Sequence, residues 1–151
     1  MSTGGLKDVP RPALVLALAG ATPFVAAPIA MLFGPDWLKL TAYVHAINYA
    51  AIALGFVGAV HWGLAMTAAS ADWRWYGAAT LPALAGWLAL GLIQPAPKLL
   101  LLGFGFAGVY MADVRAVRAG AAPGWYLGLR NPLTVVVLVS LLAMLAAVWR
   151  G

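Results

Sequence analysis

The feature that most constrains this chain is a succession of five long stretches that contain no Asp, Glu, Lys or Arg. They cover residues 12–35, 40–71, 75–97, 99–112 and 131–149. A helix that crosses the hydrocarbon core of a membrane needs about 20 mostly apolar residues. The stretches therefore predict five membrane-spanning helices, of which the fourth must borrow flanking residues to be long enough.

The composition excludes a water-soluble globule. Hydrophobic residues make up 64% of the 151 residues and charged residues only 9%, whereas about 25% of the residues in a soluble domain are charged. We expect an all-α fold, a polytopic transmembrane bundle of five helices that forms a single membrane domain over residues 1–151. The approximate spans are 12–33, 40–69, 76–95, 98–116 and 131–150.

The basic residues lie between the apolar stretches and form no basic face of the kind that binds nucleic acid, so nucleic acid is not expected as a partner. Cytoplasmic loops of membrane proteins carry an excess of Lys and Arg. With five spans, one side would hold Lys7, Arg11, Arg74, Arg115, Arg118 and Arg130, and the other Lys39, Lys98 and Arg150. This asymmetry predicts a cytoplasmic (or matrix) N-terminus and a C-terminus on the opposite side. The lack of an Arg- and Ser-rich leader favours a bacterial inner membrane.

The residues needed for several kinds of chemistry are missing. The chain has no cysteine and only two histidines, His45 and His61. These lie on the same predicted helix about 24 Å apart along its axis, so they cannot both bind one haem. The four carboxylates lie mostly at the membrane interfaces, so three ligands for a metal site cannot be assembled from them and the two distant histidines. All three lysines lie at the edges of spans, which excludes a buried Schiff base. We therefore expect no metal, no cofactor and no enzymatic activity.

Three polar residues recur at helical spacing within the second stretch: Thr41, His45 and Asn48. Polar side chains inside a membrane are costly, and they commonly form hydrogen bonds between helices. We expect this polar stripe to join helices, in preference to binding a ligand or carrying a proton.

Asp113 is the single residue that points most clearly to a specific role, because it is a carboxylate at the inner end of the fourth predicted helix. Its neighbours at three and four positions along that helix are not basic, so its partner must come from elsewhere. Arg130, just before the last span, is the expected partner. A structural ion pair and a substrate or headgroup site are both open readings, and the arginine-rich rim would also attract anionic lipids.

The order of several motifs resembles the transmembrane-protein-69-like family, a family of small polytopic membrane proteins defined by a domain of unknown function. The resemblance rests on the motifs Gly20-Ala21-Thr22-Pro23-Phe24, His61-Trp62-Gly63, Leu81-Pro82-Ala83, Tyr110 with Asp113, and Trp125-Tyr126 followed by Arg130. Tyr49-Ala50 departs mildly from the family pattern. The resemblance implies a membrane protein but no activity. It also suggests a candidate inner-face site formed by His61, Trp62, Tyr110, Asp113, Trp125, Tyr126 and Arg130.

The favoured function is that of a non-enzymatic accessory subunit or assembly factor that docks other membrane proteins, lipids or a second copy. The motivating features are the basic rim and three glycines of the fourth helix, Gly103, Gly105 and Gly108, which would allow close approach of a neighbouring helix. The alternative is a binding protein for a quinone or other hydrophobic cofactor, held by His61, Tyr110 and Asp113. A transporter is third, because few polar groups are expected at mid-membrane depth.

Overall fold

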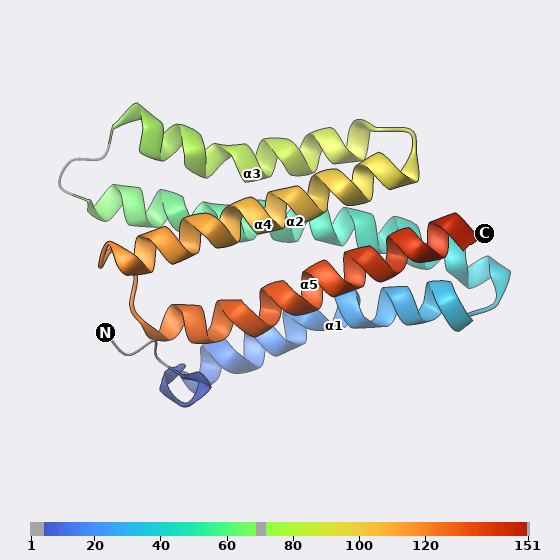
Figure 1. Ribbon diagram of the computed structural model, residues 1–151, viewed down its shortest axis with the longest axis horizontal. Helices are drawn as coiled ribbons and strands as arrows, with labels where there is room; N and C mark the ends of the chain where they lie inside the picture. Colours follow the sequence, from blue (N-terminus) through green and yellow to red (C-terminus); the bar gives the residue numbers. More distant parts are fainter. Residues whose placement is uncertain (1–4, 69–71, 151) are drawn as a thin grey trace.

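The computed structural model describes residues 5–68 and 72–150, and it confirms the all-α fold (Figure 1). A short 3-10 turn, η1 (Leu6–Asp8), precedes five helices. They are α1 (Arg11–Phe33), α2 (Asp36–Thr67), α3 (Trp73–Gly91), α4 (Pro95–Arg118) and α5 (Trp125–Arg150). These helices cover the five expected spans, with ends that differ by up to six residues. The last residue of the expected span 40–69 lies outside the described residues.

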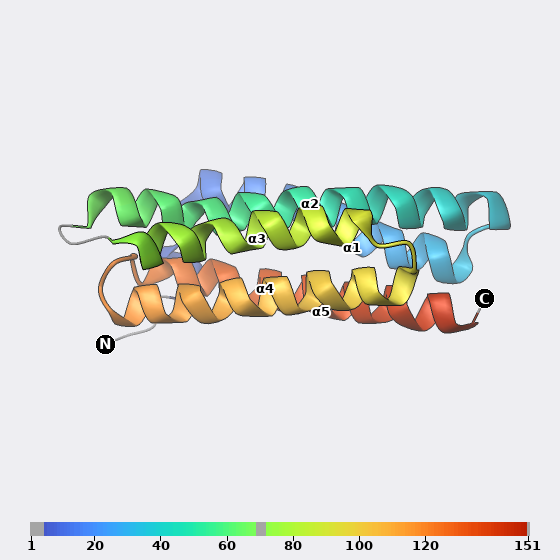
Figure 2. The same cartoon turned by 90° about the horizontal axis from the view of Figure 1, so that it is seen from above.

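The helices run alternately up and down and form a closed ring. Each helix packs against the next one in the chain, α5 packs against α1, and α4 also packs against α2. Figure 2 shows α2 and α3 on one side of the bundle with α4 and α5 opposite them. The start of α1, the end of α2, the start of α3 and the α4–α5 connection therefore lie at one end of the bundle, and the end of α5 lies at the other (Figure 1).

The helix ends follow from local sequence. Pro95 stands at the start of α4, where the missing N–H is not needed. The carboxylate of Asp72 accepts a hydrogen bond from the backbone N–H of Arg74 at 3.0 Å and so caps the N-terminus of α3. After α4 the chain turns through Gly120, whose φ of 73° is a left-handed backbone conformation that residues with a side chain rarely adopt. These signals fix where the chain reverses.

The core lies along the middle of the ring and consists of apolar side chains from all five helices. Its centre includes Phe24 of α1, whose ring meets those of Tyr49 and Phe106 edge to face, with centroids 5.5 Å and 5.8 Å away. Leu54 and Leu102 are fully buried beside them. Edge-to-face aromatic contacts of this kind add to the packing energy of a core.

Glycines allow the closest helix contacts, but only one of the three expected in α4 does so. A Cβ on Gly105 would lie 2.6 Å from Leu54, whereas a Cβ on Gly103 or Gly108 would meet no atom within 4 Å. The tightest approach of backbones is between α2 and α3, where a Cβ on Gly86 would lie 2.8 Å from the carbonyl oxygen of Ala51. Gly103 and Gly108 thus meet no other helix of the described chain, because sequence spacing does not reveal which face of α4 packs inside the bundle.

Four of the helices are long and apolar enough to cross a membrane: α1, α2, α4 and α5. Only 22% to 28% of the most apolar window of each helix is buried inside the protein. Most of the apolar surface therefore faces outward, as it does in a membrane protein, because water-soluble proteins rarely expose large contiguous apolar patches.

The short helix is not the one expected. α4 reaches 24 residues because it begins at Pro95, whereas α3 has 19 residues and is not among the four candidates. Tryptophan, tyrosine, threonine and glycine dilute the aliphatic content of α3 and lower its hydropathy.

Candidate functional site

A buried cluster of charged and polar side chains joins three helices near one end of the bundle. Asp113 of α4 has no exposed surface. Its Oδ2 accepts a hydrogen bond from Nε of Arg130 at 2.6 Å, and its Oδ1 accepts one from the hydroxyl of Tyr126 at 3.2 Å. Nε2 of His61, on α2, lies 3.3 Å from Oδ1. We call these four residues the Asp113 cluster.

The charges of the Asp113 cluster balance, but its hydrogen bonds are incomplete. Arg130 is 7% exposed, and it forms a buried ion pair with Asp113. Within the described part of the chain, Nη2 of Arg130 has no hydrogen-bond partner, and the approach of His61 to the carboxylate lacks the geometry of a hydrogen bond. A buried polar atom without a partner costs free energy, so each of these atoms marks a place where a further hydrogen-bond partner would be favourable.

The Asp113 cluster can hold α2, α4 and α5 together. His61 and Asp113 are the side chains of metal-binding type that meet here, and no group of three His, Cys, Asp or Glu side chains occurs in the ranges 5–68 and 72–150. The ion pair with Arg130 and the hydrogen bond from Tyr126 support a role in joining the helices.

The other three candidate residues lie outside the cluster. Tyr110, one turn before Asp113, donates a hydrogen bond to Oδ1 of Asn131 at 3.1 Å and so adds a second α4–α5 link. Trp125 packs edge to face on Tyr126, with centroids 6.3 Å apart. The structure thus brings four of the seven predicted residues together and leaves these two at the edge of the group.

Trp62 points to a different interface from its neighbour His61. Its Nε1 lies 3.3 Å from Oγ1 of Thr80, and its ring lies 4.9 Å from that of Tyr76. These α3 contacts border a hollow of about 730 Å³. Successive residues on a helix point about 100° apart, which is why adjacent candidates in the sequence can separate in the fold.

Two hydrogen-bonding partners were missed by the sequence analysis. Asn131 receives the hydrogen bond of Tyr110, and Thr80 receives that of Trp62. The available signal for Asn131 was its position directly after Arg130, at the start of an uncharged stretch. Thr80 carries no comparable signal because its role depends on the rotation of α3 against α2.

The polar stripe differs from expectation. Oγ1 of Thr41 bonds the carbonyl of Trp37 at 3.2 Å within α2. The hydrogen bond that crosses to α1 comes from Tyr49, whose hydroxyl donates to the carbonyl of Gly20 at 2.7 Å. His45 and Asn48 are exposed, and among the described residues no hydrogen bond ties either of them to another helix. In the described part of the chain, the stripe itself therefore forms no hydrogen bond between helices. Tyr49, beside the stripe, forms the hydrogen bond that joins α2 to α1.

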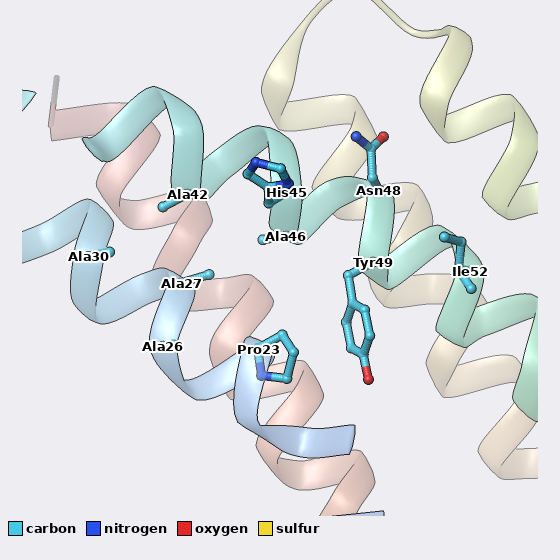
Figure 3. Close-up of a pocket in the computed structure, with 10 residues that line it drawn as sticks. All are labelled: Pro23, Ala26, Ala27, Ala30, Ala42, His45, Ala46, Asn48, Tyr49 and Ile52. Carbon is cyan, nitrogen blue, oxygen red and sulfur yellow. The ribbon is translucent and has the colours of Figure 1, made fainter. Parts of the chain in front are cut away.

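His45 and Asn48 line a surface groove between α1 and α2. Its volume is about 490 Å³, and its other walls are mostly small residues. Figure 3 shows Asn48 and Tyr49 leaving α2 in opposite directions, with Tyr49 on the α1 side. We call this hollow the α1/α2 groove; its lining residues are Pro23, Ala26, Ala27, Ala30, Ala42, His45, Ala46, Asn48, Tyr49 and Ile52.

The family comparison confirms the resemblance seen in the sequence. Residues 9–146 match the model of a family described as "Protein of unknown function (DUF3429)". The chain is similar to transmembrane protein 69 of Xenopus tropicalis, with 39% identity over 93% of this chain and 56% of the relative. It is also similar to transmembrane protein 69 of Mus musculus, with 28% identity over 93% of this chain and 58% of the relative. The chain thus spans just over half the length of these relatives. No solved structure matches.

Proposed function

Because the chain belongs to the DUF3429 family of proteins of unknown function, we propose its role from its own geometry: a non-enzymatic accessory membrane protein. In this role it docks a membrane-spanning helix of another protein in the α1/α2 groove. The observation that carries the proposal is the exposure of His45 and Asn48 on the part of α2 that contains no Asp, Glu, Lys or Arg. Neither side chain is needed for the internal packing of the bundle.

The depth of the two side chains favours a helix as the occupant. His45 and Asn48 lie about 14 and 18 Å from the start of α2, which is about 48 Å long. In a membrane of about 30 Å hydrocarbon thickness, that places them within reach of the apolar core. Lipid headgroups do not extend to this depth, whereas a neighbouring helix with a polar side chain does. The small residues of the groove would let its backbone come close.

The same proposal includes an orientation. The end of the bundle that holds the Asp113 cluster also carries Lys7, Arg74 and Arg115. The other end carries Lys39, Lys98 and Arg150. By the positive-inside rule the first end is cytoplasmic. We place α3 across the membrane as a fifth span, because its outward side chains, such as Leu81, Leu84 and Trp87, are exposed and apolar. A bacterial inner membrane remains the proposed location.

Substitution of the two exposed polar residues tests the docking role. The full chain is extracted from its native membrane in mild detergent, and the proteins bound in fixed stoichiometry are identified by mass spectrometry. We expect one identified membrane protein with the wild-type chain. The double variant His45→Leu/Asn48→Leu should retain at least tenfold less of it, because the hydrogen bonds to its helix are lost.

Thr41→Val is the matched control, because Thr41 bonds its own helix and lies outside the groove. It should retain the partner at the wild-type level. Purification of the wild-type chain alone, or equal retention by the double variant, would overturn the docking role. A stoichiometric second copy that is lost in the double variant would replace the accessory role with self-association.

The alternative of a quinone held directly by His61, Tyr110 and Asp113 has less support. Asp113 has no exposed surface and is enclosed by Arg130 and Tyr126. Tyr110 already donates to Asn131. A head group could reach the carboxylate only if these contacts separated.

A further inference from the structure

A cavity of about 400 Å³ lies among α1, α2 and α5, beside the Asp113 cluster. Its walls are almost wholly apolar, with small residues such as Ala17, Gly20 and Ala53 and larger ones such as Val57 and Leu133. Pockets for small ligands typically measure about 300 to 1,000 Å³ and are lined by apolar side chains with a few polar groups. We call this space the Arg130 cavity.

The Arg130 cavity has a polar end and an aromatic end. Tyr126 and Arg130 line one end, and Phe24, Tyr49 and Phe106 line the other. From Tyr126 to Val137, which also lines the cavity, the wall follows α5 for about 16 Å. The shape therefore fits an elongated molecule with one polar group.

Arg130 supplies an unused donor at the polar end. The residue is more than nine-tenths buried, and within the described residues its Nη2 has no hydrogen-bond partner. The remaining guanidinium contact is the hydrogen bond from Nε to Asp113. Nη2 has almost no accessible surface, so an acceptor in the cavity reaches it only when the guanidinium turns toward the cavity. That contact would remove the cost of a buried donor without an acceptor.

The charge balance selects a neutral acceptor. Asp113 already compensates the positive charge of Arg130, so a phosphate would bring an uncompensated negative charge into an apolar space, which is expensive. A carbonyl oxygen accepts the hydrogen bond without adding charge. The donor and the apolar walls together favour a carbonyl compound with an apolar body.

We propose that the Arg130 cavity binds an elongated apolar molecule whose carbonyl oxygen accepts a hydrogen bond from Nη2 of Arg130. Two membrane molecules carry this chemistry, a quinone with its ring carbonyl and a glycerolipid with its ester carbonyl. Leu16 and Phe56, which line the cavity on α1 and α2, are 72% and 76% exposed. They mark an entrance that faces the membrane interior. This binding does not depend on the docking role of the α1/α2 groove.

A cavity-filling variant and an arginine variant test the proposal. The full chain in phosphatidylcholine nanodiscs is titrated with decylubiquinone, and binding is measured by native mass spectrometry against nanodiscs without protein. Lipids retained from the native membrane are extracted and quantified in parallel. Ala53→Phe fills the Arg130 cavity without touching the ion pair. Arg130→Lys keeps the positive charge beside Asp113 but removes the planar second donor.

The matched control is Ala107→Phe, because Ala107 lines a separate hollow of about 260 Å³ whose lining residues are all apolar. We expect saturable binding by the wild-type chain and by this control, and at least tenfold weaker binding by Ala53→Phe and Arg130→Lys. Circular dichroism checks that each variant is folded, and Ala17→Leu replaces Ala53→Phe if the larger side chain prevents folding.

The two sources of the carbonyl give different results. Saturable decylubiquinone binding with the expected variant pattern identifies a quinone. A stoichiometric glycerolipid that is retained by the wild-type chain and Ala107→Phe but lost from Ala53→Phe identifies a lipid ester. Absence of both, or equal binding by Ala53→Phe and the wild-type chain, would overturn the proposal.

Discussion

At the scale of single residues, the buried pair of Asp113 and Arg130 is the strongest local constraint on this bundle. A buried carboxylate and guanidinium gain little net stability together, but loss of either one leaves an uncompensated charge in an apolar interior. Tyr126 and His61 complete the surroundings of the carboxylate. The cluster is therefore a point at which three helices must assemble in one relative position.

Asp113→Asn should lower the free energy of unfolding by about 3 to 5 kcal/mol, because the buried charge of Arg130 loses its counter-charge. The double variant Asp113→Leu/Arg130→Met should recover most of that loss, since neither charge remains. The measurement is unfolding of the purified chain by sodium dodecyl sulfate, followed by circular dichroism.

Asp36→Asn provides the control for this pair, because Asp36 bonds Lys39 at 2.8 Å on the exposed surface. Its unfolding curve should nearly coincide with that of the wild-type chain. A double variant that is less stable than Asp113→Asn would contradict the interpretation of the cluster as a compensated buried pair.

Arg130 could be predicted as the partner of Asp113 because it stands on the same side, just before the last span, and no basic residue lies one turn away from Asp113 on α4. The separation of His61 from Trp62 could not be predicted. It depends on the rotation of α2 about its own axis, and a helix that is apolar on all sides leaves little trace of that rotation in the sequence.

At the scale of helices, α2 and α3 approach each other closely enough for backbone atoms to meet. Gly86 allows it, because the space that a Cβ would need is occupied by the carbonyl oxygen of Ala51. Backbone atoms cannot turn away as a flexible side chain can, so the contact tolerates no larger residue without movement of a helix.

Gly86→Ala should therefore destabilise the chain by about 1 to 3 kcal/mol, the usual cost of overpacking. Gly108→Ala should be neutral or slightly stabilising, because its Cβ meets no atom within 4 Å and alanine is the better helix former. Thermal unfolding of both variants in the same detergent checks the difference. Equal midpoints for the two variants would mean that α2 and α3 are not packed as closely as described.

The existence and order of the helices were predictable, because uncharged stretches of membrane-spanning length are separated by charges, prolines and glycines. The relative apolarity of the third and fourth helices was not. The charge-free stretch within α4 ends at Lys98 and Asp113 and is therefore shorter than the helix. The structure shows that the helix includes both residues, with the charge of Asp113 compensated inside the bundle.

At the scale of the whole molecule, five antiparallel helices in a membrane would place the two ends of the bundle on opposite sides. The chain has no cysteine, so single cysteines can report the side directly. Trp73→Cys, in the 91% exposed position at the start of α3, should react with an impermeant maleimide only after the membrane is opened. Ile93→Cys, in the 96% exposed position after α3, should react in intact cells or vesicles of native orientation.

Labelling of both positions from the same side would contradict a membrane crossing by α3. That result would leave four spans, α1, α2, α4 and α5, which are the helices that are long and apolar enough to cross a membrane. The two termini would then share one side of the membrane.

Photo-crosslinking in the native membrane tests most directly whether the α1/α2 groove holds a helix of another membrane protein. A photoreactive amino acid is placed at Ile52, which is 70% exposed and lines the groove. In a separate control variant it is placed at Val139 of α5, which is 59% exposed and not among the lining residues of the groove. We expect Ile52 to cross-link to one identified peptide from a membrane-spanning helix, and we expect the adduct to disappear with His45→Leu/Asn48→Leu. Adducts with lipid alone at Ile52, or the same protein adduct at Val139, would contradict the docking role.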